Sequence, residues 1–284
     1  MFTMKSLLQH NKERGFTLVE MMVVAPMLII IIGTIIVSIV TLTGESLAEG
    51  GRAQLLNDVQ DSLGRIEADV QVSGAYLSTN NFTITSPQGA DNGTQKFVSI
   101  SPADYDTIIL NTFVTTANPA VSTRSLVYLP NMPYACADAN VVQNQVMTMN
   151  VVYFVKDSTL WRRTVALGTY ASKACPSVTI WQQPNCAAAS MSVNTSLCKA
   201  EDEKLLTGIL PTEFKVDYFL SATDTTPAVD TEDADPDVRQ TAIDSASTIQ
   251  VTLRAKQTYA GRDVTQQGTI RVTRNASLVK YATP

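Results

Sequence analysis

The stretch KERGFTLVEMMVVAPMLIIIIGTIIVSIV, residues 12–40, decides the fold of the N-terminal part of the chain. Its last 20 residues, Met21–Val40, carry no charge. A helix rises about 1.5 Å per residue, so this segment is about 30 Å long and matches the hydrocarbon thickness of a bilayer. The sequence therefore predicts a membrane-spanning and assembly helix, which we place at residues 16–43.

The charges that flank this segment predict its orientation. Three basic residues precede it and two acidic residues follow it: Lys5, Lys12, Arg14, Glu45 and Glu49. Positively charged flanks stay on the cytoplasmic side of a membrane. We therefore expect a single-pass protein of the cell (inner, cytoplasmic) membrane, with residues 1–15 in the cytoplasm and the chain beyond residue 44 outside.

Two other interpretations of the apolar segment fit the sequence less well. A secretory signal peptide has a shorter apolar core followed by a small-residue cleavage site, and Gly33-Thr34 and Thr43-Gly44 make only weak sites of that kind. A plain anchor leaves Glu20 unexplained, because an ionised carboxylate in a bilayer costs roughly 2.5 to 3.5 kcal/mol. Glu20 must then find a partner or reach the membrane surface. Pro26 lies in the same segment, and we expect it to cause a kink or local unwinding.

The residues KERGFTLVEMM, 12–22, resemble the cleavage and methylation motif of type IV prepilins and pseudopilins. The resemblance implies that a prepilin peptidase cuts between Gly15 and Phe16, removing residues 1–15 as a leader, and methylates Phe16. It also implies that Glu20 pairs with the terminal amine of Phe16 in a neighbouring subunit. The implied partners are other pilin or pseudopilin subunits, the prepilin peptidase, the inner-membrane assembly platform and, before assembly, the lipid bilayer.

An amphipathic helix should follow the membrane segment. Apolar residues recur three and four positions apart after Gly50-Gly51: Leu56, Val59, Leu63, Ile66 and Val70. This spacing is typical of a helix with one buried face. We therefore expect an exported helix over residues 44–76, continuous with the first, with a hinge at the glycine pair and its apolar face on a sheet.

The remainder, residues 77–284, predicts a β-rich head. Short apolar or alternating runs indicate strands, and they cover 97–100, 107–114, 125–129, 146–155, 160–167, 214–220, 249–256 and 270–272. The fold class is therefore α+β, a long helix on a mostly antiparallel sheet. Val151–Val155 with Leu160–Arg163, Val272–Asn275 and Gln60–Tyr76 resemble parts of the larger J-type and W-type minor pilins.

Four cysteines lie beyond the apolar segment: Cys136, Cys175, Cys186 and Cys198. Their spacing fits no metal or redox motif, and an even number in an exported region favours two disulfides over four buried thiols. Three connectivities are open. A hairpin turning at residues 156–159 favours Cys136–Cys175, which leaves Cys186–Cys198 to close a short loop.

Composition excludes several classes of function. The net charge is −5, and the leader carries +2, so the remainder carries −7 and is a poor general binder of nucleic acid. The one histidine, His10, is in the leader, which excludes histidine catalysis and histidine metal ligands after processing. The sequence has no phosphate-binding glycine loop and no nucleophile elbow. We expect no enzymatic activity and no cofactor.

Two charged regions remain as candidate sites. The acidic stretch 224–237 contains six carboxylates, which suits either calcium or a solvated loop, and its two prolines favour the loop. Residues 239–284 carry seven basic and two acidic residues, a net charge of +5. Outward-facing basic residues on strands explain this charge better than DNA binding does. The sequence thus predicts a minor pilin or pseudopilin of a type IV pilus, a competence pseudopilus or a type II secretion pseudopilus. The alternative is a pilin-anchored adhesin or binding module.

Overall fold

The structure is a computed structural model, and it describes most of the chain with internal gaps. The described residues are 17–79, 106–119, 123–129, 145–166, 180–186, 198–228 and 236–274. The chain divides into two compact units, Met1–Gly50 and Gly51–Pro284.

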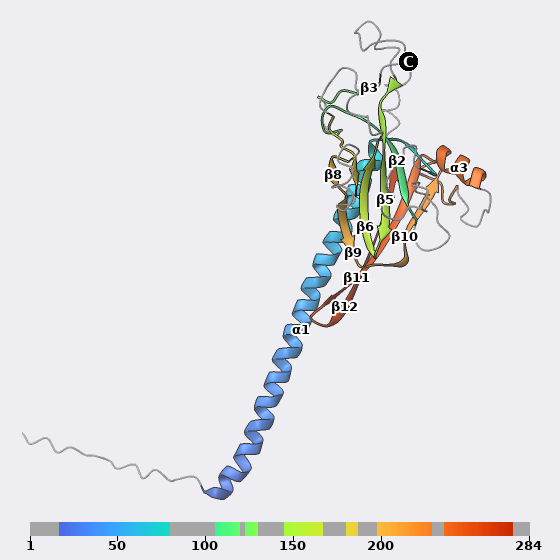
Figure 1. Ribbon diagram of the computed structural model, residues 1–284. Coiled ribbons are helices and arrows are strands. Elements are labelled where there is room, and N and C mark those ends of the chain that lie inside the picture. The colour runs from blue at the N-terminus through green and yellow to red at the C-terminus, as the bar shows by residue number, and fades with distance from the viewer. Residues whose placement is uncertain are drawn as a thin grey trace, which may run out of the picture. The chain divides into compact units, whose positions relative to one another are not determined.

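Helix α1 spans Leu18–Gln71, 54 residues (Figure 1). It continues through Pro26, so the predicted local unwinding at the proline is not present. The two units meet at Gly50-Gly51, within this helix. Up to Gly50, the apolar side chains are exposed, and burial begins at Gly51. The described part of the first unit is thus a helix whose apolar side chains are exposed.

The second part of α1 buries one face, as its apolar spacing predicts. The buried positions recur three and four apart: Gly51, Leu55, Val59, Ser62, Leu63, Ile66 and Val70. Leu56 was predicted to be in this face and is instead 36% exposed, because Leu55 occupies the core position four residues before Val59.

The helix ends at Gln71 and not at residue 76 as predicted. Ser73 Oγ donates to the carbonyl of Val70 at 2.8 Å and closes the last turn. Strand β1, Ser73–Tyr76, begins there. A Cβ at Gly74 would lie 2.9 Å from the Phe113 ring, so the chain passes too close to β2 for another helical turn with side chains.

A five-stranded antiparallel sheet has the order β1-β2-β5-β6-β9. Its other strands are β2 (Ile108–Phe113), β5 (Thr148–Lys156), β6 (Thr159–Val165) and β9 (Glu203–Thr207). The predicted hairpin is confirmed: β5 and β6 are joined by Asp157 and Ser158, both with positive φ (52° and 54°). Such a turn matches the right-handed twist of paired strands.

A three-stranded antiparallel sheet follows in sequence, in the order β10-β11-β12. Its strands are β10 (Ile209–Phe219), β11 (Thr248–Tyr259) and β12 (Arg262–Thr273), and α3 (Pro236–Ser245) lies between β10 and β11 in the chain. Two short pairs complete the described elements: β3 (Tyr128–Leu129) with β4 (Gln145–Val146), and β7 (Asn185–Cys186) parallel to β8 (Ala200–Glu201).

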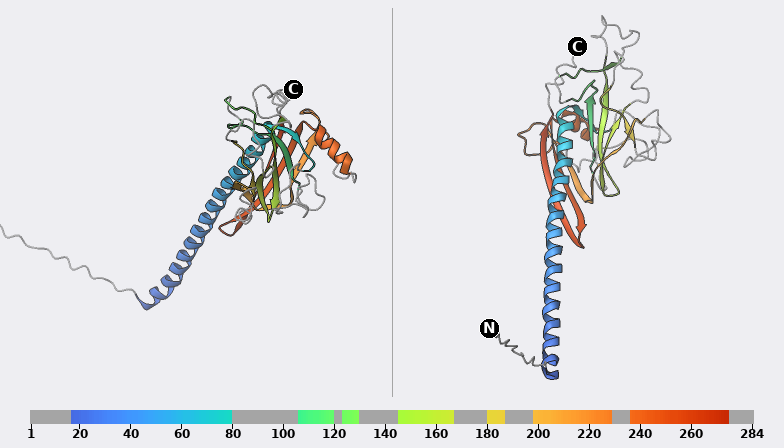
Figure 2. Two further views of the ribbon diagram at one scale, coloured as in Figure 1. Left: turned by 45° about the horizontal axis from the view of Figure 1, so that its top comes forward. Right: turned by 90° about the vertical axis from the view of Figure 1, so that its left-hand side faces the viewer.

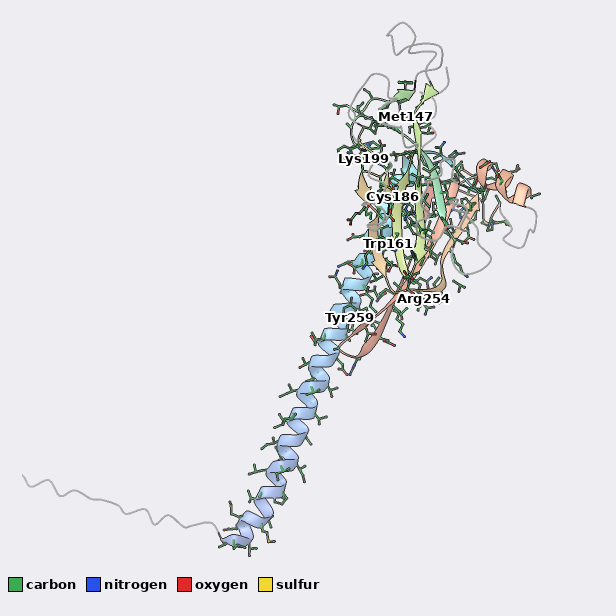
Figure 3. The ribbon with its side chains drawn as sticks, in the orientation of Figure 1. Met147, Trp161, Cys186, Lys199, Arg254 and Tyr259 are labelled. Carbon is green, nitrogen blue, oxygen red and sulfur yellow. A yellow bond between two sulfur atoms is a disulfide. The ribbon has the colours of Figure 1, made fainter. Side chains whose placement is uncertain are left out.

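The core lies between the head part of α1 and both sheets. Figure 2 shows both sheets beside this part of the helix, with the strands of the three-stranded sheet crossing it. A Cβ at Gly268 of β12 would lie 2.6 Å from Leu63 Cδ1 and 2.9 Å from Val59 Cγ1, so the glycine lets α1 approach the strand. The same holds at Gly51, where the Tyr259 ring of β11 occupies the position of a Cβ (Figure 3).

A second apolar cluster covers the other face of the five-stranded sheet. Side chains alternate along a strand, so Ile109, Val152 and Phe154 face away from α1. They pack with Val165 and with both Cys186 and Cys198.

Most strand predictions are confirmed with shifted ends, and five of the described elements were not predicted. These are the strands β1, β7, β8 and β9 and the helix α3, which begins inside the predicted loop 224–237. Strand 97–100 lies outside the described residues. Leu220 was predicted to belong to a strand, whereas β10 ends at Phe219 and Leu220 is 55% exposed.

Candidate functional site

The first turn of α1 is closed by Thr17 and Glu20. Glu20 Oε2 accepts from the backbone N–H and from the hydroxyl of Thr17, both at 2.9 Å. Thr17 Oγ1 in turn accepts from the Glu20 N–H at 3.3 Å. This reciprocal arrangement is a capping box, and it satisfies backbone donors that a helix start leaves free. Glu20 is therefore held at the helix start by its own chain.

The rest of the first unit presents apolar surface. Over its described residues, all large apolar side chains are exposed, Leu18 at 81% and Leu47 at 57% among them. Its hydroxyls bond within the helix, since Thr34, Ser38, Thr41 and Thr43 donate to carbonyls three or four residues earlier. Among the described residues, α1 alone is long and apolar enough to cross a membrane. Such a surface must be covered by lipid or by other protein.

The predicted processing residues, Gly15 and Phe16, lie outside the described residues. Glu20 lies within them, at the exposed start of the helix. Glu20 is also the one charged residue between Thr17 and Gly44.

Helix α1 is fastened to the five-stranded sheet by a largely buried polar cluster. Arg162 Nε donates to Asp69 Oδ2 at 2.6 Å, and Arg162 Nη2 donates to Asp69 Oδ1 at 3.3 Å. Tyr153 Oη donates its proton to Asp69 Oδ2 at 2.5 Å and also lies 3.1 Å from the carbonyl oxygen of Arg65. The side chains of Arg162 and Asp69 are only 12% and 13% exposed. The cluster therefore joins α1, β5 and β6 where water has little access.

The protonation of Tyr153 supports this arrangement. Burial, together with the neighbouring charge of Asp69, raises the pKa of Tyr153 well above its ordinary value. The phenol therefore keeps its proton and remains a donor to Asp69. Glu203 extends the cluster toward solvent, accepting from Arg162 at 3.4 Å and from Arg65 at 3.3 Å.

The cysteine prediction is met for one pair. The structure contains a disulfide between Cys186 and Cys198, with their Cα atoms 5.7 Å apart. The other pair, Cys136 and Cys175, lies outside the described residues, so Cys136–Cys175 stays a prediction.

The acidic stretch 224–237 lies partly outside the described residues. Asp224 accepts from the N–H and the hydroxyl of Ser221, both at 2.8 Å, which forms a local turn. The described ranges contain no group of three or more histidine, cysteine, aspartate or glutamate side chains arranged for a metal ion.

Several basic residues of 239–284 have intramolecular partners. Arg254 pairs with Glu213 at 3.3 Å, and Lys256 pairs with Asp263 at 2.6 Å. Arg271 donates to the carbonyl of Asp224 and lies over the Phe219 ring, 3.9 Å from its centroid. Arg274 donates to the carbonyl of Gly74 and lies over the Tyr76 ring. Four of the seven basic residues of this region thus have partners within the head.

Two features of the site were missed from sequence. The capping box has a readable signal, Thr17-x-x-Glu20 before an apolar run. The contact of Asp69 with Arg162 and Tyr153 has none, because it joins residues more than 80 positions apart.

Comparison with known proteins adds no assignment: no protein-family model matches the chain, and no curated protein matches it.

Proposed function

We propose that the chain is a minor pilin or pseudopilin subunit, which assembles through its N-terminal helix into a type IV pilus, a competence pseudopilus or a type II secretion pseudopilus. Its work is assembly and not catalysis. The observation that carries the proposal is the bare apolar helix of the first unit, with Glu20 at its start.

The exposed apolar surface of the helix suits two environments in turn, first a membrane and then a filament. In a membrane, lipid would cover the side chains from Leu18 to Leu47, because all backbone groups of a helix bond internally. In a filament, the same side chains would pack against the helices of neighbouring subunits. A head that stands on its own core, from Gly51 onward, would remain unchanged in both environments.

Glu20 supports a specific contact in the filament. Its carboxylate has two oxygens, and both bonds from Thr17 fall on Oε2. The other oxygen keeps its acceptor capacity and can take the terminal ammonium of Phe16 from a neighbouring subunit. In hydrocarbon such a pair neutralises two charges that are both costly when unpaired. The contact would also fix the axial register between subunits.

Processing would come before assembly. The proposed order is insertion with residues 1–15 in the cytoplasm, cleavage between Gly15 and Phe16 by a prepilin peptidase, methylation of Phe16, and uptake by an inner-membrane assembly platform. The outer head would acquire its disulfide after export, because exported compartments are oxidising.

The experiment is mass spectrometry of the chain from its native host, on membranes and on filaments sheared from the cells. The proposal predicts a methylated Phe16 terminus and the presence of residues 16–284 in the sheared fraction. An intact Met1, or a cut near Gly44, contradicts the proposal. Correct processing without any chain in the filaments would favour the alternative, an adhesin or binding module displayed on a pilin anchor.

A further inference from the structure

The two segments that flank the disulfide form a small flap on the face of the five-stranded sheet that points away from α1. The flap consists of residues 184–186 and 198–202, which include β7 and β8. Its segments are joined by the Cys186–Cys198 bond and by backbone bonds, from Lys199 N–H to the Pro184 carbonyl at 2.7 Å and from Asp202 N–H to the Cys186 carbonyl at 2.9 Å. The disulfide and the position of Asp202 thus belong to one small unit.

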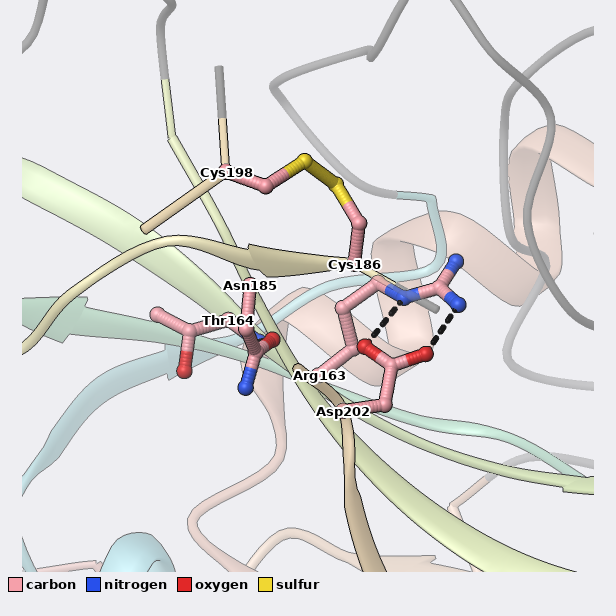
Figure 4. The surroundings of a disulfide bond; sticks show 6 residues. All are labelled: Arg163, Thr164, Asn185, Cys186, Cys198 and Asp202. Atoms are coloured by element: carbon pink, nitrogen blue, oxygen red, sulfur yellow. Dashed lines mark hydrogen bonds and ion pairs between the residues drawn. A yellow bond between two sulfur atoms is a disulfide. The ribbon is translucent and has the colours of Figure 1, made fainter. Parts of the chain in front are cut away.

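The flap brings a carboxylate to a buried arginine. Arg163 Nε donates to Asp202 Oδ1 at 2.9 Å, and its Nη2 donates to Asp202 Oδ2 (Figure 4). The two side chains are 1% and 4% exposed. Arg163 also lies over the Phe154 ring, 4.8 Å from its centroid. A buried guanidinium without its carboxylate is strongly unfavourable, so the flap supplies the charge that Arg163 requires.

The flap also covers apolar surface and a strand edge. Cys186 and Cys198 are 2% and 1% exposed and complete the apolar cluster on this face of the sheet. Beside them, Asn185 Oδ1 accepts from the backbone N–H of Thr164 in β6 (Figure 4). That N–H is therefore a direct reporter of whether the flap is closed.

We infer that the Cys186–Cys198 bond and the Asp202–Arg163 pair act as one redox-dependent latch, which holds the flap closed over β6. The latch goes beyond the proposed function and does not depend on it. On closing, the two thiols give two electrons and two protons to an external disulfide such as oxidised glutathione. One S–S bond forms in the protein, one breaks in the oxidant, and the oxidant leaves as two thiols.

Hydrogen exchange of the full-length chain in detergent tests the latch. The readout is the amide of Thr164, and the amides of β11 report the stability of the rest of the head. In Cys186→Ala/Cys198→Ala, we expect Thr164 to exchange about 30-fold faster or more, because a disulfide across a short loop restrains opening by that order. Exchange in β11 should stay unchanged. Equal protection of Thr164 with and without the disulfide overturns the inference, and so does equal loss of protection in β11.

Coupling is tested by adding Asp202→Asn to both backgrounds. With the disulfide present, Asp202→Asn should speed Thr164 exchange about tenfold, because Arg163 loses the buried carboxylate of Asp202. If the disulfide is what holds Asp202 on Arg163, Asp202 leaves Arg163 when the disulfide is removed, and the same substitution should then change the rate less than about twofold. The same factor in both backgrounds would mean two independent contacts and would overturn the latch.

Two further variants serve as controls, one for the loss of a carboxylate elsewhere and one for changes in packing. Asp263→Asn removes a carboxylate from an exposed pair with Lys256 and should leave Thr164 exchange unchanged. Arg163→Met/Asp202→Leu replaces both charges with apolar groups, so no charge is left unpaired. The flap should then remain closed in the oxidised protein. An open flap in this variant as well would assign the effect to packing and contradict the role of the ion pair.

Discussion

At the scale of residues, the neighbours Arg162 and Arg163 show how one strand makes contacts on both faces of its sheet. Successive side chains of β6 point to opposite sides of the sheet. Arg162 therefore meets Asp69 on α1, and Arg163 meets Asp202 on the flap. Each guanidinium obtains one buried carboxylate from a different part of the chain. The two arginines hold the helix and the flap to the same strand.

Asp69→Ala should destabilise the head strongly. The substitution leaves Arg162 and Tyr153 without their shared acceptor in a site with little water. We expect the free energy of unfolding to fall by about 3 kcal/mol, the order measured when a buried pair loses one partner. Urea unfolding of the full-length chain, followed by tryptophan fluorescence, measures it. Asp263→Ala, in an exposed pair, is the control and should behave like the wild type.

Asp106 should make stability depend on pH. Burial raises the pKa of Asp106 to about 6, although the Val216 N–H, which donates to it at 2.8 Å, and the charge of Lys215 both lower it. The charge of Asp217 raises it further. An unfolded aspartate titrates near pH 4. The folded state therefore holds this proton more tightly than the unfolded state does. The stabilisation that results is fully present below about pH 4 and is lost as the pH rises through about 6.

The test compares the wild type with Asp106→Asn between pH 4 and pH 7. The free energy of unfolding of the wild type, taken relative to the variant, should fall by about 2 kcal/mol across this range. A difference between the two proteins that stays constant with pH would contradict the assignment to Asp106.

At the scale of elements, two glycines differ in the space available for a side chain. Gly268 of β12 faces α1, where a Cβ would lie within 3 Å of Leu63 and Val59, whereas Gly64 of α1 has open space at the position of a Cβ. Gly268→Ala should therefore destabilise the head by about 1 to 3 kcal/mol through overpacking. Gly64→Ala should stabilise it by about 0.5 to 1 kcal/mol through helix propensity. Thermal unfolding of both variants measures this contrast, and a change of the same sign in both would contradict the packing of α1 on β12.

The elements that repeat a local pattern could be predicted from sequence. The alternation of Ile249, Val251 and Leu253 placed β11, and the spacing of Val59, Leu63 and Ile66 placed the buried face of α1. Local pattern did not place β9, because its burial alternates only weakly. The end of α1 was predicted too late, since the close approach of Gly74 to Phe113 depends on a distant strand. In the site, Glu20 was predicted and the partners of Asp69 were not.

At the scale of the whole molecule, the two units differ in whether they bury their own apolar side chains. The unit Gly51–Pro284 has its own core, whereas the described part of Met1–Gly50 presents exposed apolar side chains. A chain of residues 51–284, secreted so that its cysteines oxidise, should therefore fold and stay monomeric without detergent. Size-exclusion chromatography and thermal unfolding check this prediction. Aggregation, or loss of a cooperative transition, would show that the head depends on the first unit.

The central proposal about the whole molecule is that it assembles into filaments through Glu20. Its most direct test is the amount of a Glu20 variant in filaments relative to the amount in membranes. The measurement is the abundance of Glu20→Ala in sheared filaments divided by its abundance in membranes, with Glu49→Ala as the control on the same helix. Loss of a carboxylate that pairs in hydrocarbon should lower this ratio by about tenfold or more, while processing and insertion continue. Glu49→Ala should keep the ratio of the wild type. An unchanged ratio for Glu20→Ala would contradict the account.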